Sequence, residues 1–115
     1  MTKYRIIISP QAQRDLKEIR AYTLQSWGST QADDYLSKIE DPFYSLLENP
    51  EMGRERNDVK AGCRSIAIEK HVLFYKIEKS EINILGIPHV RMDILKYFSW
   101  KIYEIDQNKI FVAIK

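Results

Sequence analysis

From Arg64 to Asp93 the chain reads RSIAIEKHVLFYKIEKSEINILGIPHVRMD. Three apolar runs of strand length are separated by short polar breaks at residues 69–70 (EK) and 78–80 (EKS), a pattern that predicts an antiparallel meander. In the middle run, residues 71–77, apolar residues occupy both sets of alternating positions, so both faces of the strand are apolar. A strand with two apolar faces needs cover on both sides of its sheet. The function of the chain therefore depends on what covers each face.

Two amphipathic helices precede the meander and are expected to cover one face. A strand at residues 4–8 ends at Ser9-Pro10, and a capping serine followed by proline is typical of a helix start. Apolar residues then recur every three or four positions up to Gly28, which predicts the end of the first helix. The second helix follows within two residues, capped by Ser29 or Thr30, so the pair must form an antiparallel hairpin. Pro42 lies in its apolar stripe and predicts a kink or a split.

This order of elements predicts an α+β fold of two layers, β-α-α-β-β-β, with the helical hairpin on one face of a mostly antiparallel sheet. The opposite sheet face is predicted to be bare. Residues 92–98 are expected to form a short helical turn, and residues 1–98 to form the domain. Residues 99–115 contain KIYEI, a polar DQNK turn and IFVAI, which predict a β-hairpin-like extension and not a separate domain.

The composition excludes several functional classes. The chain has 115 residues, 44% of them hydrophobic, and a net charge of only +2, which is far from the charge of a dedicated nucleic-acid binder. Direct sequence-specific binding of nucleic acid is therefore not expected. The absence of a long apolar run and of a signal-peptide pattern, together with the lone Cys63, predicts a cytoplasmic protein without a membrane segment or a disulfide. The two histidines and one cysteine lack metal-ligand spacing, and there is no glycine-rich phosphate loop, so no metal and no cofactor are expected.

Several motifs occur along the chain in one order. They are SPQAQRDLKEI at 9–19, Trp27-Gly28, Gln31-Ala32, LLENPEMGRER at 46–56, GCRSI at 62–66, HVLFYKI at 71–77 and PHVRMD at 88–93. In this order they resemble the ParE branch of the RelE/ParE toxins of bacterial toxin–antitoxin pairs. The resemblance covers about residues 4–98, and residues 99–115 depart from it, because members of this branch commonly stop near residue 98.

The resemblance implies the toxin of a type II toxin–antitoxin system, of the kind associated with plasmid stabilisation, held inactive by a ParD-like antitoxin. The ParE branch is associated with inhibition of DNA gyrase, which would make the chain an inhibitor and not an enzyme. The RelE branch cuts messenger RNA on the ribosome. A third alternative is a degenerate module that only binds its antitoxin, because the extension at residues 99–115 puts toxicity itself in question.

A RelE-like ribonuclease would need a base, an acid and cations around the cleaved phosphate. The residues available for these roles are Arg64, His89, Arg91 and Tyr97, and Arg64 aligns with an arginine of the family. Structural roles are the alternative for three of them. Arg64 could be a strand residue whose charged end reaches solvent or an ion-pair partner of Asp93, His89 could belong to a hydrogen-bonded turn, and Arg91 could form a local pair with Asp93. PHVRMD is typical of ParE-like members, and the resemblance implies that these lack a nuclease site. No catalytic residues are therefore predicted.

A partner surface is the other kind of site that the sequence predicts. If they face away from the helices, four residues of the meander form a contiguous apolar patch of the sort that marks a docking site. An antitoxin strand or amphipathic helix could bind there, at the sheet edge or in the helical groove. Alternatively, residues 101–114 fold back over the same surface. The candidate partner-binding residues are Trp27, Val72, Phe74, Leu85, Ile87 and Arg91.

Overall fold

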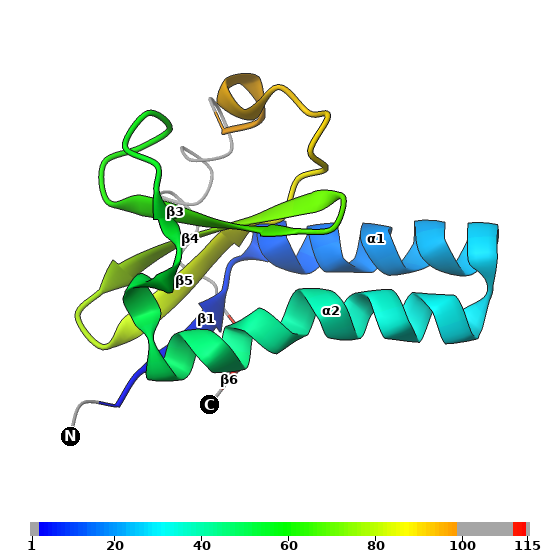
Figure 1. The fold of residues 1–115 in the computed structure, drawn as a ribbon, viewed down its shortest axis with the longest axis horizontal. Coiled ribbons are helices and arrows are strands. Elements are labelled where there is room, and N and C mark those ends of the chain that lie inside the picture. The colour runs from blue at the N-terminus through cyan, green and yellow to red at the C-terminus, as the bar shows by residue number, and fades with distance from the viewer. Residues whose placement is uncertain (1–2, 99–111, 115) are drawn as a thin grey trace.

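A computed structural model describes residues 3–98 and 112–114. The two-layer α+β fold predicted from the sequence is confirmed (Figure 1). The elements in chain order are β1 (Arg5–Ile8), α1 (Pro10–Trp27), α2 (Ser29–Glu48), the 3-10 turn η1 (Pro50–Met52), β2 (Arg54–Glu55), β3 (Cys63–Ile68), β4 (His71–Glu78), β5 (Glu81–Gly86) and β6 (Val112–Ile114). The strands form one sheet in the order β2-β3-β4-β5-β1-β6.

The helical hairpin begins and turns where the sequence predicts. The Ser9 Oγ accepts a hydrogen bond from the Ala12 N–H at 3.1 Å, and Pro10 is the first helical residue. Gly28 separates the helices with a φ of 95°, a left-handed conformation that glycine adopts without strain. One detail of α2 differs from prediction, because no side chain caps its start. The helix continues through Pro42 as a single element, which excludes the split that was one of the two alternatives there.

The meander is built from two tight hairpins. Both turns begin with a residue at positive φ, Glu69 at 54° and Lys79 at 57°, as in the two-residue turns that match the twist of the strands. β1 then pairs with β5 in parallel, with Arg5 opposite Glu81 and Ile8 opposite Ile84. This parallel pair places the first strand of the chain between the meander and β6.

The face of the sheet under the helices holds the main core. Its buried side chains come from both layers: Ile6, Ile8, Ala12, Ile19, Ile39, Phe43, Leu46, Ile68, Leu73, Tyr75, Ile82, Ile84 and Ile87. The alternation of the strands therefore positions Leu73 and Tyr75 toward the helices, as their spacing in the sequence indicates.

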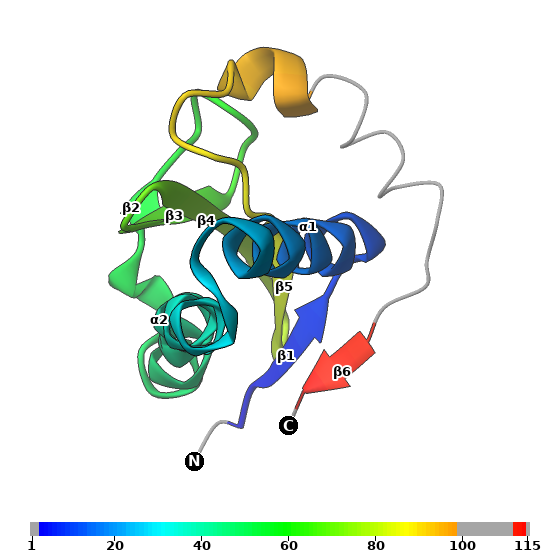
Figure 2. The ribbon, with the colours of Figure 1, turned by 90° about the vertical axis from the view of Figure 1, so that its right-hand side faces the viewer.

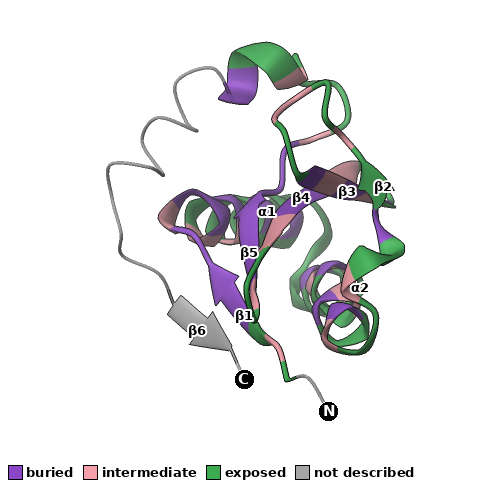
Figure 3. Ribbon diagram, turned by 90° about the vertical axis from the view of Figure 1, so that its left-hand side faces the viewer, coloured by how far each residue is buried: buried purple, intermediate pink, exposed green. Residues whose placement is uncertain are grey.

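The opposite face of the sheet is not bare, and that prediction is wrong. A helical turn at residues 94–98 lies over it, and Phe74, Leu85, Tyr97 and Phe98 form a second buried cluster with Cys63. The rings of Phe74 and Phe98 meet edge to face with centroids 5.0 Å apart. Figure 3 shows the last residues of this turn as buried, like β5 and β1 beneath it. The chain thus supplies part of the cover itself.

The C-terminal extension contributes the last strand of the sheet. β6 runs antiparallel to β1, with Ile6 opposite Ile114 and Ile8 opposite Val112 (Figure 2). The other half of the predicted hairpin falls in residues 99–111, which lie outside the described residues. The described part of the extension lies at the edge of the sheet and not over its second face.

Candidate functional site

Arg64 is held in a structural role at the start of β3. Its guanidinium donates hydrogen bonds to the Glu51 carbonyl at 3.0 Å and the Gly53 carbonyl at 2.7 Å, and it pairs with Glu55 at 3.5 Å. Tyr75, opposite Arg64 in the register, donates to the Pro50 carbonyl at 2.6 Å. These bonds fix the segment after α2 to the sheet, so Arg64 is not a free cation.

The PHVRMD motif continues the sheet beyond β5 and then begins the helical turn. His89 forms a bridge with His71, and its Nδ1 accepts a hydrogen bond from the Arg91 N–H at 3.1 Å. The Asp93 Oδ1 accepts from the Lys96 N–H at 3.2 Å, which caps residues 94–98. The motif therefore directs the chain from the last strand of the meander onto the second face.

His71 joins this motif to the helical hairpin. Its Nδ1 lies 2.8 Å from the hydroxyl of Tyr35, which also accepts from the Lys70 N–H at 3.2 Å. Burial, with the nearby His89 as a second cause, lowers the pKa of His71 to about 4, while Asp15 acts weakly in the opposite direction.

This depressed pKa predicts a loss of stability in acid. The unfolded chain takes up the His71 proton near pH 6.5, whereas the folded chain takes it up only near pH 4. The contribution is complete above pH 6.5 and should be lost as the pH falls from 6.5 to 4. The full shift corresponds to about 3.4 kcal/mol, and because His71 is only partly buried the expected loss is about 2 kcal/mol. Urea unfolding across that range should show the loss, and His71→Gln should flatten that part of the profile. A slope that persists unchanged in His71→Gln would assign it to other groups.

Tyr97 is buried against α1. Its hydroxyl donates a short hydrogen bond to the Asp15 Oδ2, which also accepts from the Ile87 N–H at 2.8 Å, and the Asp15 Oδ1 accepts from the Gln11 Nε2 at 2.8 Å. Burial and the adjacent Asp15 carboxylate raise the pKa of Tyr97 far above its usual value. The exposed fraction of Tyr97 is 8% and that of Asp15 is 6%. Asp15 therefore joins α1, the end of β5 and the helical turn.

The four candidate nuclease residues are not assembled into one site. Arg64 lies opposite Tyr75, whereas His89 lies opposite His71, four residues away along β4. At about 3.3 Å per residue this is a separation of roughly 13 Å. Tyr97 is enclosed, and Arg91 is exposed at the surface. The geometry brings only His89 and Arg91 together.

The proposed apolar patch is also absent as an exposed surface. Phe74 is fully buried, and Leu85 and Ile87 are 7% and 2% exposed. Ile87 belongs to the core under the helices, and Val72 packs at the margin of the second cluster. Of the candidate partner-binding residues, Trp27 and Arg91 are the exposed ones, with Trp27 at 68%.

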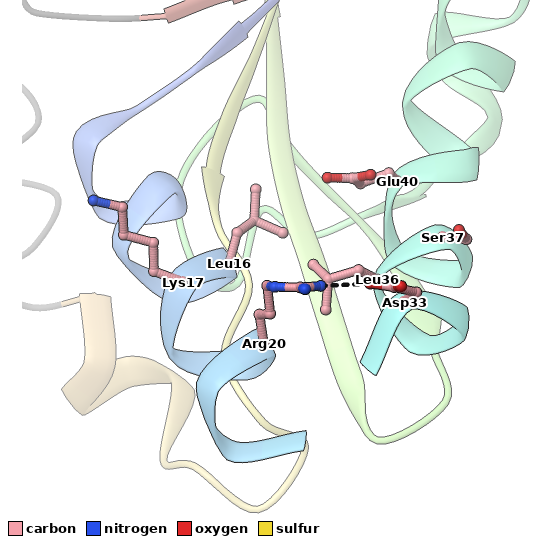
Figure 4. A pocket seen from close by; sticks show the side chains of 7 residues that line it. All are labelled: Leu16, Lys17, Arg20, Asp33, Leu36, Ser37 and Glu40. Atoms are coloured by element: carbon pink, nitrogen blue, oxygen red, sulfur yellow. Dashed lines mark hydrogen bonds and ion pairs between the residues drawn. The ribbon is translucent and has the colours of Figure 1, made fainter. Parts of the chain in front are cut away.

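One surface that is open to a partner lies on the helical hairpin. A groove of about 470 Å³ runs between α1 and α2, with Leu16 and Leu36 at its base. Lys17 and Arg20 line the α1 side, and Asp33, Ser37 and Glu40 line the α2 side (Figure 4). Arg20 and Asp33 form an ion pair of 2.6 Å between the two helices. The groove is thus apolar at its base and of opposite charge on its two sides.

Metal and thiol chemistry find no support in the described part of the chain. No group of three or more His, Cys, Asp or Glu side chains within residues 3–98 is placed to hold a metal ion. Cys63 is 1% exposed, and burial raises the pKa of its thiol to about 11, although the nearby Arg56 acts in the opposite direction. A buried thiol with a raised pKa is a poor nucleophile. Among the described residues, none of the helices is long and apolar enough to cross a membrane.

A comparison with protein families identifies the fold and its function class. The family described as the ParE toxin of the type II toxin-antitoxin system, parDE, matches residues 6–94. The chain belongs to the ParE toxin family. The ParE1 toxin of Mycobacterium tuberculosis is 33% identical to it over 91 residues, which cover 78% of this chain and 93% of that toxin. The ParE1 toxin of Caulobacter vibrioides is 33% identical over 93 residues, covering 81% and 94%.

Solved structures of related toxins share the fold of this ParE-family chain. A chain of the chromosomal ParDE system from P. aeruginosa superposes with a TM-score of 0.67 at 20% identity, covering 76% of this chain and 96% of that one. A mutant of the E. coli toxin RelE in the free state superposes with a TM-score of 0.57 at 19% identity, covering 91% and 99%. The fold is therefore common to ParE and RelE toxins, and it does not by itself separate their targets.

Proposed function

We propose that this ParE-family toxin inhibits DNA gyrase, acts in the cytoplasm, and is neutralised by a ParD-like antitoxin. Its membership of the family supports the role of toxin in a type II pair. One observation favours an inhibitor over a ribonuclease: two of the candidate catalytic side chains form hydrogen bonds within the fold. Arg64 is bound to two backbone carbonyls, and the Tyr97 hydroxyl is bound to Asp15. Each group would have to give up these hydrogen bonds to contact a substrate phosphate.

The antitoxin is proposed to bind the helical hairpin. The groove has an apolar base at Leu16 and Leu36, which suits the apolar face of an amphipathic helix. The opposite charges on its two sides would set the orientation of that helix. Trp27 at the end of α1 is exposed and offers a second apolar contact on the same hairpin. An interface around such an aromatic residue is the usual location of strong binding contributions.

Purified toxin is expected to inhibit gyrase directly. Supercoiling of relaxed plasmid DNA by gyrase should fall as toxin is added, cleaved DNA should accumulate, and preincubation with the antitoxin should restore supercoiling. The matched control is the closely related topoisomerase IV under the same conditions. Full gyrase activity at saturating toxin would reject the gyrase proposal, and antitoxin binding without toxicity would indicate the degenerate module.

Arg64→Ala separates the inhibitor from the RelE-like alternative. We expect it to lower the free energy of unfolding by about 1–2 kcal/mol, because two hydrogen bonds to backbone carbonyls are lost. Arg54→Ala, a change at an exposed arginine of the neighbouring β2, should have little effect. The test combines urea unfolding with mapping of messenger RNA ends in a translation reaction. Codon-specific cuts by the wild type that disappear in Arg64→Ala would favour the ribonuclease.

A further inference from the structure

β1 has an apolar edge along residues 6–8, and within the described residues it is the C-terminal strand β6 that covers this edge. β1 lies between β5 and β6 in the sheet, and β6 pairs with it from Ile6 to Ile8. The family match ends at residue 94, so β6 lies beyond the matched region. Figure 2 shows β6 beside β1 at this end of the sheet. The covering strand is therefore a feature of this chain beyond the family domain.

The direction of the backbone N–H and C=O groups along β1 determines which of these groups form hydrogen bonds with β6. The Arg5 N–H donates to the Ser80 carbonyl at 2.9 Å, and the Ser9 N–H donates to the Ile84 carbonyl at 3.1 Å. Because backbone groups alternate along a strand, Arg5, Ile7 and Ser9 face β5, whereas Ile6 and Ile8 face β6. The paired residues Ile6↔Ile114 and Ile8↔Val112 are then the hydrogen-bonded pairs of the antiparallel ladder. Without β6, the N–H and C=O groups of Ile6 and Ile8 have no strand partner.

The sheet ends at β2 on one side and at β6 on the other, and without β6 the edge on that side would be β1. The β2 edge and this β1 edge differ in how readily another strand could pair with them. The β2 edge is two residues long and carries the charges of Arg54 and Glu55, features that discourage strand addition. The β1 edge has three consecutive isoleucines, and the Arg5 charge before them is paired with Glu81 at 2.6 Å. An apolar strand of β-branched residues with an open edge is a template for pairing with another chain.

We propose that β6 closes the β1 edge against pairing with a second copy of the chain. Release of β6 would expose the donors and acceptors of Ile6 and Ile8, and two β1 strands could then pair antiparallel about a two-fold axis. In the folded chain, β6 forms hydrogen bonds with these donors and acceptors of Ile6 and Ile8. The C-terminal extension thus keeps the free toxin monomeric, and this role does not depend on the toxin's target.

Two proline variants of the full chain test the proposal. Val112→Pro removes the N–H that faces Ile8, whereas the N–H of Ala113 faces away from β1, so Ala113→Pro is the matched control. Amide hydrogen exchange in dilute protein should be at least about tenfold faster at Ile6 and Ile8 in Val112→Pro, with Ile7 unchanged. Sedimentation at rising concentration should show dimers for Val112→Pro and monomers for the wild type and Ala113→Pro.

The wild type provides a check that does not depend on whether a variant folds. Its Ile6 and Ile8 amides should be protected to the same degree as the Ile7 amide, which is bonded to β5. Unprotected Ile6 and Ile8 amides in the wild type would overturn the pairing of β6 with β1. A Val112→Pro variant that exchanges rapidly and yet stays monomeric at all concentrations would overturn the role in preventing self-association.

Discussion

Asp15→Ala should lower the free energy of unfolding by about 3 kcal/mol, because buried donors lose their common acceptor. The carboxylate accepts hydrogen bonds from the Gln11 side chain, the Ile87 N–H and the Tyr97 hydroxyl, and all of these groups are buried. Alanine leaves the Ile87 N–H and the Tyr97 hydroxyl without this partner in an interior that excludes water. The loss should appear as a lower urea midpoint for global unfolding.

Two further variants are the matched controls for Asp15→Ala. Asp15→Asn retains an oxygen that can accept from both Ile87 and Tyr97 and should lose markedly less stability than Asp15→Ala. Glu18→Ala removes an exposed carboxylate from the same helix and should change stability by no more than about 0.5 kcal/mol. Equal effects at positions 15 and 18 would show that Asp15 does not join α1 to the end of β5 and the helical turn.

Phe98→Ala should be destabilising by about 3–4 kcal/mol, the usual cost of truncating a buried phenylalanine. The Phe98 ring is 2% exposed and meets Phe74 and Tyr97 edge to face, with centroids 5.0 and 4.8 Å apart. Its removal uncovers part of the second sheet face. Binding of a dye specific for apolar surface should increase in native conditions, alongside a lower thermal midpoint.

Leu95→Ala is the control within the same helical turn. Leu95 is 63% exposed, so its truncation should cost less than about 0.5 kcal/mol. The contrast between positions 95 and 98 measures how much of the stability comes from packing on Phe74 and not from the turn itself. Similar losses at both positions would contradict the closed second face.

The elements of the fold could be predicted because each has a strong local pattern. Ser9-Pro10 and Gly28 mark the ends of α1, and the polar pairs between apolar runs mark the turns of the meander. The position of β1 was not predicted, because parallel pairing with β5 depends on contacts that no local pattern contains.

The candidate site was predicted less well, for a related physical reason. Asp15 has the spacing of a solvated helix residue, and two of its partners, Ile87 and Tyr97, lie 72 and 82 residues away in the sequence. Phe74 was assigned to a bare face, because a turn as short as residues 94–98 does not look like a covering layer. The adjacent aromatic pair Tyr97-Phe98 is the signal that could have indicated it.

The parallel pairing of β1 with β5 also determines when the β-sheet of this toxin can form during synthesis of the chain. Arg5 pairs with Glu81, 76 residues later, so the first strand made by the ribosome waits without its partner until most of the chain has emerged. Such long-range pairing is slow to form and leaves apolar strands open in the meantime. The second partner of β1 arrives later still, with Val112–Ile114. The N-terminal strand therefore stays unpaired through most of the synthesis of this domain, and its pairing with β5 becomes possible before its pairing with β6.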